Sequence, residues 1–133
     1  LDAERALPFA DGAFDRVLVD APCTGTGTLR HNPEIRWRVT PEDIAELSRR
    51  QRRFLAEAAR ALRPGGRLVY STCSVEREEN EEVTADFLRT REDFRQVEAT
   101  PAPETIRLPG GSARTWPHRD NADGFYVAAF ERR

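Results

Sequence analysis

The sequence predicts an α/β fold in which parallel strands are joined by helices. Three observations indicate this class. Residues 14–20 contain an apolar run typical of a strand, residues 40–62 have the spacing of an amphipathic helix, and residues 67–72 form a second strand-like run. A strand, a helix and a strand in this order predict a parallel pair joined by a helical crossover.

The size and composition of the chain indicate a single domain. At 133 residues it is long enough to bury a modest core. No apolar run approaches the length of a bilayer span and no signal-peptide pattern is present, so we expect a soluble protein. Two cysteines do not make a disulfide framework, which fits a reducing compartment and predicts a cytoplasmic location.

One compositional feature, the absence of methionine, suggests a longer parent protein. The chain contains no methionine, not even at position 1, and all 21 of its basic residues are arginine. Because a natural chain begins with methionine, residues 1–133 are expected to be a piece of a longer protein. The net charge of −2 is close to zero and by itself indicates no nucleic-acid partner.

The first strand and the first helix have clear local signals. The continuous apolar run in residues 14–20 predicts a strand buried on both faces, as in a parallel sheet. Thr40 can cap the helix, Pro41 suits its first position, and the acids at 42–43 face the positive end of the helix dipole. The sequence "RPGG" at 63–66 is expected to end it. The predicted inward face consists of Ile44, Leu47, Phe54, Leu55, Ala58 and Leu62.

The remaining elements are a second helix and two further strands. Residues 78–91 predict the helix, and residues 93–99 and 124–132 predict the strands. Residues 101–117 are rich in Pro, Gly and Thr, and they predict a loop. Because no helix separates the last two strands, they are expected to lie antiparallel at one edge. The inward face of the second helix is expected to consist of Val83, Phe87 and Leu88.

Reactive side chains follow the first two predicted strands. Asp20 and Cys23 come just past the end of the first strand, and Cys73 comes just past the end of the second. Ligands of open parallel sheets bind beyond the carboxyl ends of the strands, and neighbouring strands lie about 5 Å apart. If the two strands are adjacent, both thiols and one carboxylate meet in one cleft. This convergence is the main functional signal in the sequence.

Simpler interpretations of the same residues stay open. A cysteine is often only a small buried apolar residue, and Asp20 can cap a loop. Gly25 and Gly27 can serve a turn, because a lone "GTG" is weak evidence of a phosphate site. His31 and His118 are too isolated to predict a metal site, and no metal-ligand spacing is present.

A thiol at this position could act as a nucleophile. Cys73 precedes a predicted helix, whose N-terminal dipole can lower the pKa of a thiol and favour the thiolate. A neighbouring carboxyl group suits proton handling or a hydrogen bond to an amino group. A thiol with an acid and without a histidine base fits attack on an electron-poor ring better than protease chemistry.

Three motifs resemble one known family. The sequences "DAPCTGTG" (20–27), "STCS" (71–74) and "EEN" (78–80) are similar to those of the Sun family of RNA (cytosine-5)-methyltransferases. The likeness extends to "LRPGGRLVYSTCS" and to the closing "DGFYVAAFERR". It implies a Rossmann-like fold that uses S-adenosylmethionine. The chain is then expected to be the C-terminal half of a single catalytic domain, with parallel strands and an antiparallel edge pair, while the cofactor-binding half lies upstream.

The resemblance also implies roles for individual residues. Cys73 would be the nucleophile that adds to carbon 6 of cytosine, and Cys23 would assist release of the covalent enzyme–RNA intermediate. Asp20 would lie against the target base and the methionine end of the cofactor, and Asp2 would contact its adenine. The ranking of the two cysteines rests on the family, because in related DNA enzymes the thiol after the proline is the attacker.

The implied partner is RNA, with ribosomal RNA favoured. Arg30, Arg36 and Arg38 beside Trp37 suit phosphate contacts and base stacking, and "SRRQRR" at 48–53 could add phosphate contacts. The alternative for both segments is a solvated basic face. The isolated chain is expected to be inactive and to self-associate through the free edge of its first strand.

Two other functions remain possible from sequence. One is a methyltransferase that acts on an exocyclic nitrogen, although such enzymes usually have an aromatic residue where this chain has Cys23. The other is a thiol redox or binding module, in which the cysteines form a functional couple. A covalent adduct with RNA that contains 5-fluorocytosine would support the cytosine-5 hypothesis alone.

Overall fold

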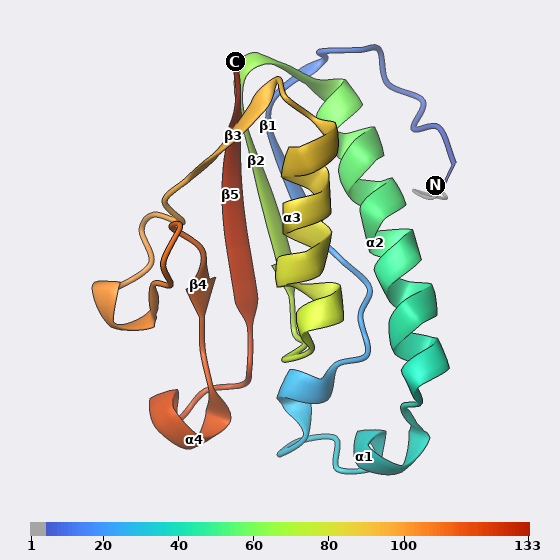
Figure 1. The fold of residues 1–133 in the computed structure, drawn as a ribbon, viewed down its shortest axis with the longest axis vertical. Coiled ribbons are helices and arrows are strands. Elements are labelled where there is room, and N and C mark those ends of the chain that lie inside the picture. The colour runs from blue at the N-terminus through green and yellow to red at the C-terminus, as the bar shows by residue number, and fades with distance from the viewer. Residues whose placement is uncertain (1–4) are drawn as a thin grey trace.

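A computed structural model describes residues 5–133, so Asp2 lies outside the described residues. Its sheet has the strand order β1-β2-β5-β3, and β4 also pairs with β5 (Figure 1). The strands are β1 (Phe14–Asp20), β2 (Leu62–Thr72), β3 (Phe94–Val97), β4 (Ala113–Arg114) and β5 (Tyr126–Arg132). The helices are α1 (Ile35–Arg38), α2 (Pro41–Ala61), α3 (Glu81–Thr90) and α4 (Pro117–Asp120), with short 3-10 turns η1 (Thr26–Thr28), η2 (Arg77–Glu79) and η3 (Glu104–Ile106).

The strand directions confirm the predicted α/β class. β1 and β2 are parallel and are joined by α2 as a crossover. β3 and β5 form the predicted antiparallel pair, but β5 lies inside the sheet because it also pairs with β2 in the antiparallel sense. The predicted loop from 101 to 117 holds only η3, β4 and the first residue of α4.

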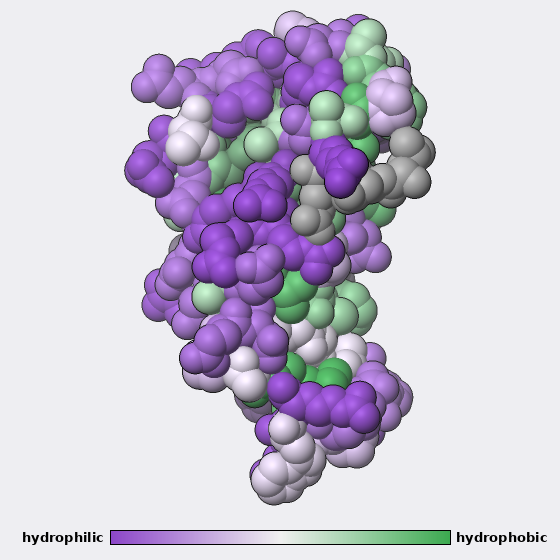
Figure 2. Space-filling model, turned by 90° about the vertical axis from the view of Figure 1, so that its right-hand side faces the viewer, coloured by the Kyte–Doolittle hydropathy of each residue, from purple (hydrophilic) through white to green (hydrophobic). Residues whose placement is uncertain are grey.

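Both long helices cover the same face of the sheet (Figure 1). Leu55 of α2 and Phe87 of α3 pack in one core with Tyr70 of β2 and Phe130 of β5. The outer surface of this helix layer is mostly hydrophilic (Figure 2). None of the helices in the described part of the chain is long and apolar enough to cross a membrane.

The start of α2 is as predicted, and its end differs slightly. Thr40 caps the helix, and Asp43 completes a capping box because it accepts from the Thr40 N–H at 2.9 Å. The helix ends at Ala61, and β2 begins at once with Leu62, so "RPGG" is part of the strand and not a separate stop. The positive φ of 78° at Gly65 and a register shift in the β1–β2 pairing accommodate this turn of the chain.

The prediction that residues 14–20 form a strand buried on both faces is wrong for the described residues. The side chains of β1 are exposed or half-buried, and Leu18 is 66% exposed. β1 pairs with β2 on one side, and α2 and α3 cover only one sheet face. Val17 and Val19 therefore reach the core from its margin, whereas Leu18 points to the uncovered face.

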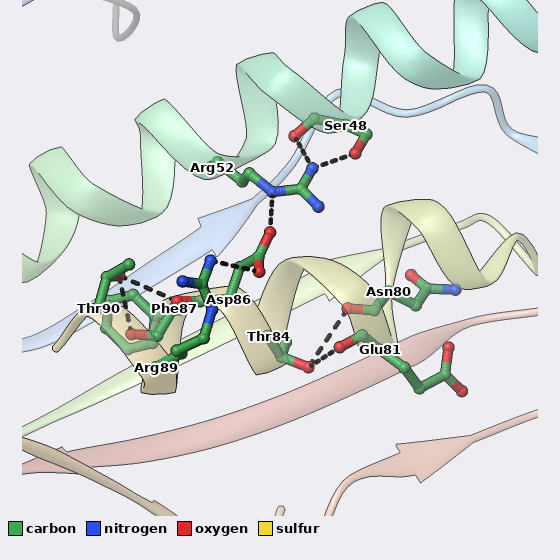
Figure 3. Close-up of polar contacts among 9 residues, drawn as sticks. All are labelled: Ser48, Arg52, Asn80, Glu81, Thr84, Asp86, Phe87, Arg89 and Thr90. Carbon is green, nitrogen blue, oxygen red and sulfur yellow. Dashed lines mark hydrogen bonds and ion pairs between the residues drawn. The ribbon is translucent and has the colours of Figure 1, made fainter. Parts of the chain in front are cut away.

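A polar bridge connects the two helices across their contact (Figure 3). Arg52 of α2 donates through Nε to Asp86 of α3 at 2.7 Å, and through Nη1 to the carbonyl oxygen of Ser48 at 3.0 Å. Arg89 also donates to Asp86, at 3.0 Å. These contacts fix the lateral position of α3 on α2, next to the apolar contact that Leu55 makes.

We expect Leu55→Ala to lower the free energy of unfolding by about 2–5 kcal/mol, because it leaves a cavity between both helices and the sheet. Urea unfolding followed by circular dichroism measures this. Leu29→Ala serves as the control, since Leu29 is 37% exposed, and it should cause a clearly smaller loss. Equal losses in the two variants would contradict the described core.

Candidate active site

The two cysteine thiols are in direct contact. Cys23 Sγ and Cys73 Sγ lie 3.3 Å apart, although fifty residues separate them in the sequence. The parallel register places Asp20 opposite Ser71, so the loops that follow β1 and β2 leave the sheet side by side. The predicted convergence of the two cysteines is therefore confirmed. Asp20 is exposed at the same edge, and its Oδ1 accepts from Ser71 Oγ at 3.0 Å.

The contact makes the two thiols unequal. Cys23 is the more deeply enclosed, so it keeps its proton and donates to Cys73. This hydrogen bond lowers the pKa of Cys73 to about 7, while burial and the carboxylates of Asp20 and Glu79 oppose the lowering. The same hydrogen bond, together with burial, raises the pKa of Cys23. The sequence predicted that a helix N-terminus lowers the pKa of Cys73. The main cause is instead the neighbouring Cys23 thiol, since α3 begins only at Glu81.

The two glycines of the first loop have different tasks. Gly25 has a φ of 73°, a backbone conformation that suits glycine, and serves the turn into η1. Gly27 donates from its N–H to the Cys73 carbonyl oxygen at 2.9 Å and accepts from the Gly124 N–H at 2.7 Å. A Cβ atom at Gly27 would lie 1.9 Å from the Gly124 oxygen. Gly27 is therefore required by its close contact with the protein backbone.

A third segment, just before β5, completes the site. Besides the Gly124 contact, Asp123 accepts from Arg30 Nε at 2.8 Å and lies 3.2 Å from His31 Nε2. Sequence reasoning assigned no role to this segment. The glycine directly before a strand was the available signal, because a chain that approaches another backbone closely needs a residue without Cβ.

Two buried polar residues of the "EEN" motif support the cysteine loops, and sequence reasoning gave them no role. Glu79 and Asn80 are both fully buried. Glu79 accepts hydrogen bonds from both cysteine loops, and Asn80 bonds to residues on either side of Cys73. Gln51 of α2 is also fully buried and donates to Glu79 at 3.0 Å. The available signal in the sequence was a carboxylate and an amide at the start of a predicted helix that packs on the sheet.

The two predicted basic segments differ in whether the side chains described below are exposed or paired with carboxylates of the protein. Trp37 of α1 is 83% exposed, and the Arg36 guanidinium lies 5.4 Å from the centre of its ring. A hollow of about 390 Å³ separates Arg36 from Val75, two residues beyond Cys73. On α2, by contrast, Arg49 pairs with Glu46 and Arg52 pairs with Asp86, so these two arginines are engaged within the protein.

No group of three or more His, Cys, Asp or Glu residues with metal-binding geometry occurs within residues 5–133. The reactive groups of the described site are thus two thiols, one exposed carboxylate and the loop backbone that holds them. Such a set suits covalent addition by a thiolate with proton transfer between neighbours.

Solved structures with the same fold define the class of protein. NSun6 from Pyrococcus horikoshii, solved with SFG, is 32% identical, with a TM-score of 0.81 over 99% of this chain and 33% of that chain. A methyltransferase homologue from the same organism is also 32% identical, with a TM-score of 0.70 over 90% of this chain and 39% of that one. The fold is that of Rossmann-like methyltransferases dependent on S-adenosylmethionine.

The family follows from sequence similarity over nearly the whole chain. Residues 2–131 match the family described as "16S rRNA methyltransferase RsmB/F", and the chain belongs to this family. Ribosomal RNA small subunit methyltransferase B of Thermus thermophilus is 44% identical over 88% of this chain, and that of Vibrio cholerae is 41% identical over 90%. The chain spans only 26% to 31% of the length of the curated relatives it matches.

We expect Cys23→Ala to raise the pKa of Cys73 from about 7 to the ordinary thiol value of about 8.5 or above, because the donor that stabilises the thiolate is lost. Alkylation by iodoacetamide at a series of pH values, followed by mass spectrometry of the Cys73 peptide, measures this pKa. At pH 7 the reaction should slow by roughly tenfold or more. An unchanged midpoint would show that Cys23 does not stabilise the Cys73 thiolate.

Proposed function

We propose that the protein to which this chain belongs transfers a methyl group from S-adenosylmethionine to carbon 5 of a cytosine in ribosomal RNA, through a covalent adduct with Cys73. The observation that carries the proposal is the Cys23–Cys73 contact at the carboxyl ends of two parallel strands. It puts a thiol with a pKa of about 7 beside a second thiol that keeps its proton. Relatives named as ribosomal RNA small subunit methyltransferases support the choice of RNA.

The proposed reaction uses the two thiols in different steps. The Cys73 thiolate forms a bond to carbon 6 of the ring, and carbon 5 becomes nucleophilic enough to accept a methyl group. Carbon 5 then gives its proton to a water molecule acting as base, the electron pair of that C–H bond forms the double bond between carbons 5 and 6, the bond between carbon 6 and Cys73 breaks, and the thiolate is regenerated. Cys23 lies 3.3 Å from the leaving sulfur, where a group that assists release is needed. The unequal pKa values support the assignment of Cys73 as the attacker.

The described residues fit one part of the cofactor. Asp20 lines a hollow of about 290 Å³ together with apolar side chains that include Val19, Pro22 and Phe54. An apolar hollow with one carboxylate suits a ligand that combines an apolar body with an amino group. Asp20 would accept from that amino group, with its own orientation set by Ser71. When bound, S-adenosylmethionine supplies an electrophilic methyl group. The role of Asp2 at the adenine remains a prediction.

A solved relative supports this choice of cofactor. NSun6 from Pyrococcus horikoshii was solved with SFG, an analogue of S-adenosylmethionine, and it shares the fold over 99% of this chain. We infer that residues 1–133 are the C-terminal portion of one catalytic domain and that the rest of that domain completes the cofactor site beside β1. By the same inference the isolated chain lacks methyltransferase activity and self-associates through the free edge of β1.

The RNA would meet the site beside α1. Trp37 offers an exposed ring for base stacking, and Arg36 and Arg38 on the same helix offer charge for phosphates. The hollow between α1 and the Cys73 loop is lined by Arg36 on one side and by Val75, two residues beyond Cys73, on the other. Arg30 contributes less, because Asp123 already neutralises it.

A thiol redox or binding module is the second candidate, and the contact between the sulfurs is the observation that favours it. Such a module would use the cysteines as a couple, without RNA and without a methyl donor. A methyltransferase that acts on an exocyclic nitrogen is the third. It would use neither thiol, so both cysteines could be replaced with retention of activity.

Covalent trapping on RNA that contains 5-fluorocytosine tests the proposal in the intact protein. Cys73→Ala should abolish both methylation and the covalent adduct, because the attacking thiolate is lost. Cys23→Ala should instead accumulate a stable protein–RNA adduct on natural RNA, because attack survives and release fails. Mass spectrometry and denaturing gel electrophoresis measure the adduct. An adduct formed by Cys73→Ala would overturn the assignment, and full methylation by the double variant would favour the exocyclic-nitrogen alternative.

Replacement of Trp37 by alanine tests the RNA surface. Loss of one stacked base corresponds to about 1–3 kcal/mol, so we expect the affinity of the intact protein for 16S rRNA to fall by about 5- to 150-fold. Filter binding at fixed salt measures it. Arg49→Ala is the control, since Arg49 also lies on the surface but pairs with Glu46 at 2.6 Å, and it should leave the affinity nearly unchanged. Equal affinities of both variants would exclude stacking on Trp37.

A further inference from the structure

Each cysteine is followed directly by a residue with a hydroxyl group, Thr24 after Cys23 and Ser74 after Cys73. Both hydroxyls donate to the same atom, Oε2 of Glu79, and the Thr24 bond measures 2.6 Å. The Thr24 N–H donates to Oε1 of the same carboxylate at 2.9 Å. One buried carboxylate therefore joins the loops after β1 and β2 at the residues that adjoin the two thiols.

A third segment is tied to the same carboxylate. Gln51 of α2 donates through Nε2 to Glu79 Oε1 at 3.0 Å and to the Pro22 carbonyl oxygen at 2.9 Å. Cys23 is thus held on both sides, through Pro22 before it and Thr24 after it. The helix that connects the two strands takes part in this arrangement, so the position of the first loop is fixed against both β2 and α2.

The chemistry of the pocket around Glu79 requires a carboxylate. Four donors converge on it: the Thr24 N–H, the Thr24 and Ser74 hydroxyls, and the Gln51 amide. Only a group with two oxygens that accept and do not donate can satisfy all four. A glutamine there would keep one accepting oxygen, and its amide would need both hydroxyls to reverse direction.

Asn80 makes the corresponding contacts around the second cysteine. Its Oδ1 accepts from Thr72 Oγ1 at 2.5 Å, and its Nδ2 donates to the Ser74 carbonyl oxygen at 2.8 Å. The residues on both sides of Cys73 therefore each have one contact that does not involve Glu79. Loss of the Glu79 carboxylate would release mainly Thr24 and, with it, the adjoining Cys23, because Pro22 keeps its bond to Gln51 and Gly27 keeps its bond to the Cys73 carbonyl oxygen.

We propose that Glu79 is a positioning residue of the cysteine pair: its carboxylate holds the Cys23 loop against the Cys73 loop and keeps the two thiols within hydrogen-bonding distance. Glu79 acts through Thr24, Ser74 and Gln51, and not by reacting itself. The inference rests on the proposed function only in that it takes the two thiols as the reacting groups. Its test needs neither RNA nor cofactor, so its failure and the failure of the proposed function are distinguishable.

The pH dependence of Cys73 alkylation in the intact protein tests the proposal. In the protein without substitutions, the midpoint of the pH dependence of Cys73 alkylation should lie near 7. In Glu79→Ala, Cys23 should move away from Cys73. The loss of the Cys23 hydrogen bond, the largest cause of the lowered Cys73 pKa, should outweigh the removal of the opposing Glu79 charge. The midpoint should therefore rise toward about 8.5, and alkylation at pH 7 should slow by about 15-fold. Glu79→Gln should give an intermediate midpoint, because its single accepting oxygen keeps part of the arrangement.

Glu81→Ala is the matched control for a loss of stability alone. Glu81 lies two residues along, and its carboxylate pairs with Arg114, which is 7% exposed, at 2.9 Å. This variant should lower the melting temperature and leave the midpoint near 7. A Glu79→Ala protein that is also destabilised but keeps a midpoint near 7 would overturn the proposal, because Glu79 would then have only a structural role.

A milder pair of variants decides the question if Glu79→Ala does not fold. Thr24→Val removes one hydroxyl at nearly constant volume and should raise the midpoint of Cys73 alkylation. Thr24→Ser keeps the hydroxyl and should give the same midpoint as the protein without substitutions. Unchanged midpoints in both variants would overturn the proposal. A raised midpoint in Thr24→Val alone would support it.

Discussion

The parallel pairing of β1 with β2 determines where every reactive group of this chain lies. With Asp20 opposite Ser71, the loop after each strand leaves the sheet at the same edge, and the two cysteines meet. A shift by one residue would turn Asp20 and its neighbours to the other face of the sheet. The core that contains Leu55 of α2 and Tyr70 of β2, with Val17 and Val19 of β1 packed against it, fixes this register. The stability of the fold and the geometry of the site therefore have the same origin.

Two chemically identical side chains obtain different properties from this arrangement. Either sulfur could donate in the contact between them, and the difference comes from their surroundings. Cys23 is held between Pro22 and Thr24 and is more enclosed, so a charge there is less stable. Cys73 receives the hydrogen bond and is more open to a substrate. Identical groups with separated pKa values are a common basis for dividing the work of one reaction between them.

Local signals in the sequence were sufficient for the main strands and helices and for the meeting of the two cysteines. The Thr40 cap, the α2 crossover and the meeting of Cys23 with Cys73 are confirmed, because caps and periodicity act over a few residues and parallel strands align their ends. The exposure of Leu18 could not be predicted, because the sequence of an apolar strand does not show which other elements pack on its two faces. The contacts of Glu79 were also hidden, since its four donors come from three segments, two of which are distant from it in the sequence.

Gly27 and Gly124 limit how this site can change over evolutionary time. Each lies so close to the other that a single added carbon would overlap neighbouring atoms. For Gly27 those atoms are backbone oxygens of Gly124 and Cys73, which every amino acid carries. No substitution at Gly124 or Cys73 can make room for a side chain at position 27, in contrast to an ordinary core position, where a smaller partner compensates for a larger residue. A descendant of this sequence could replace this glycine only by remodelling the whole loop.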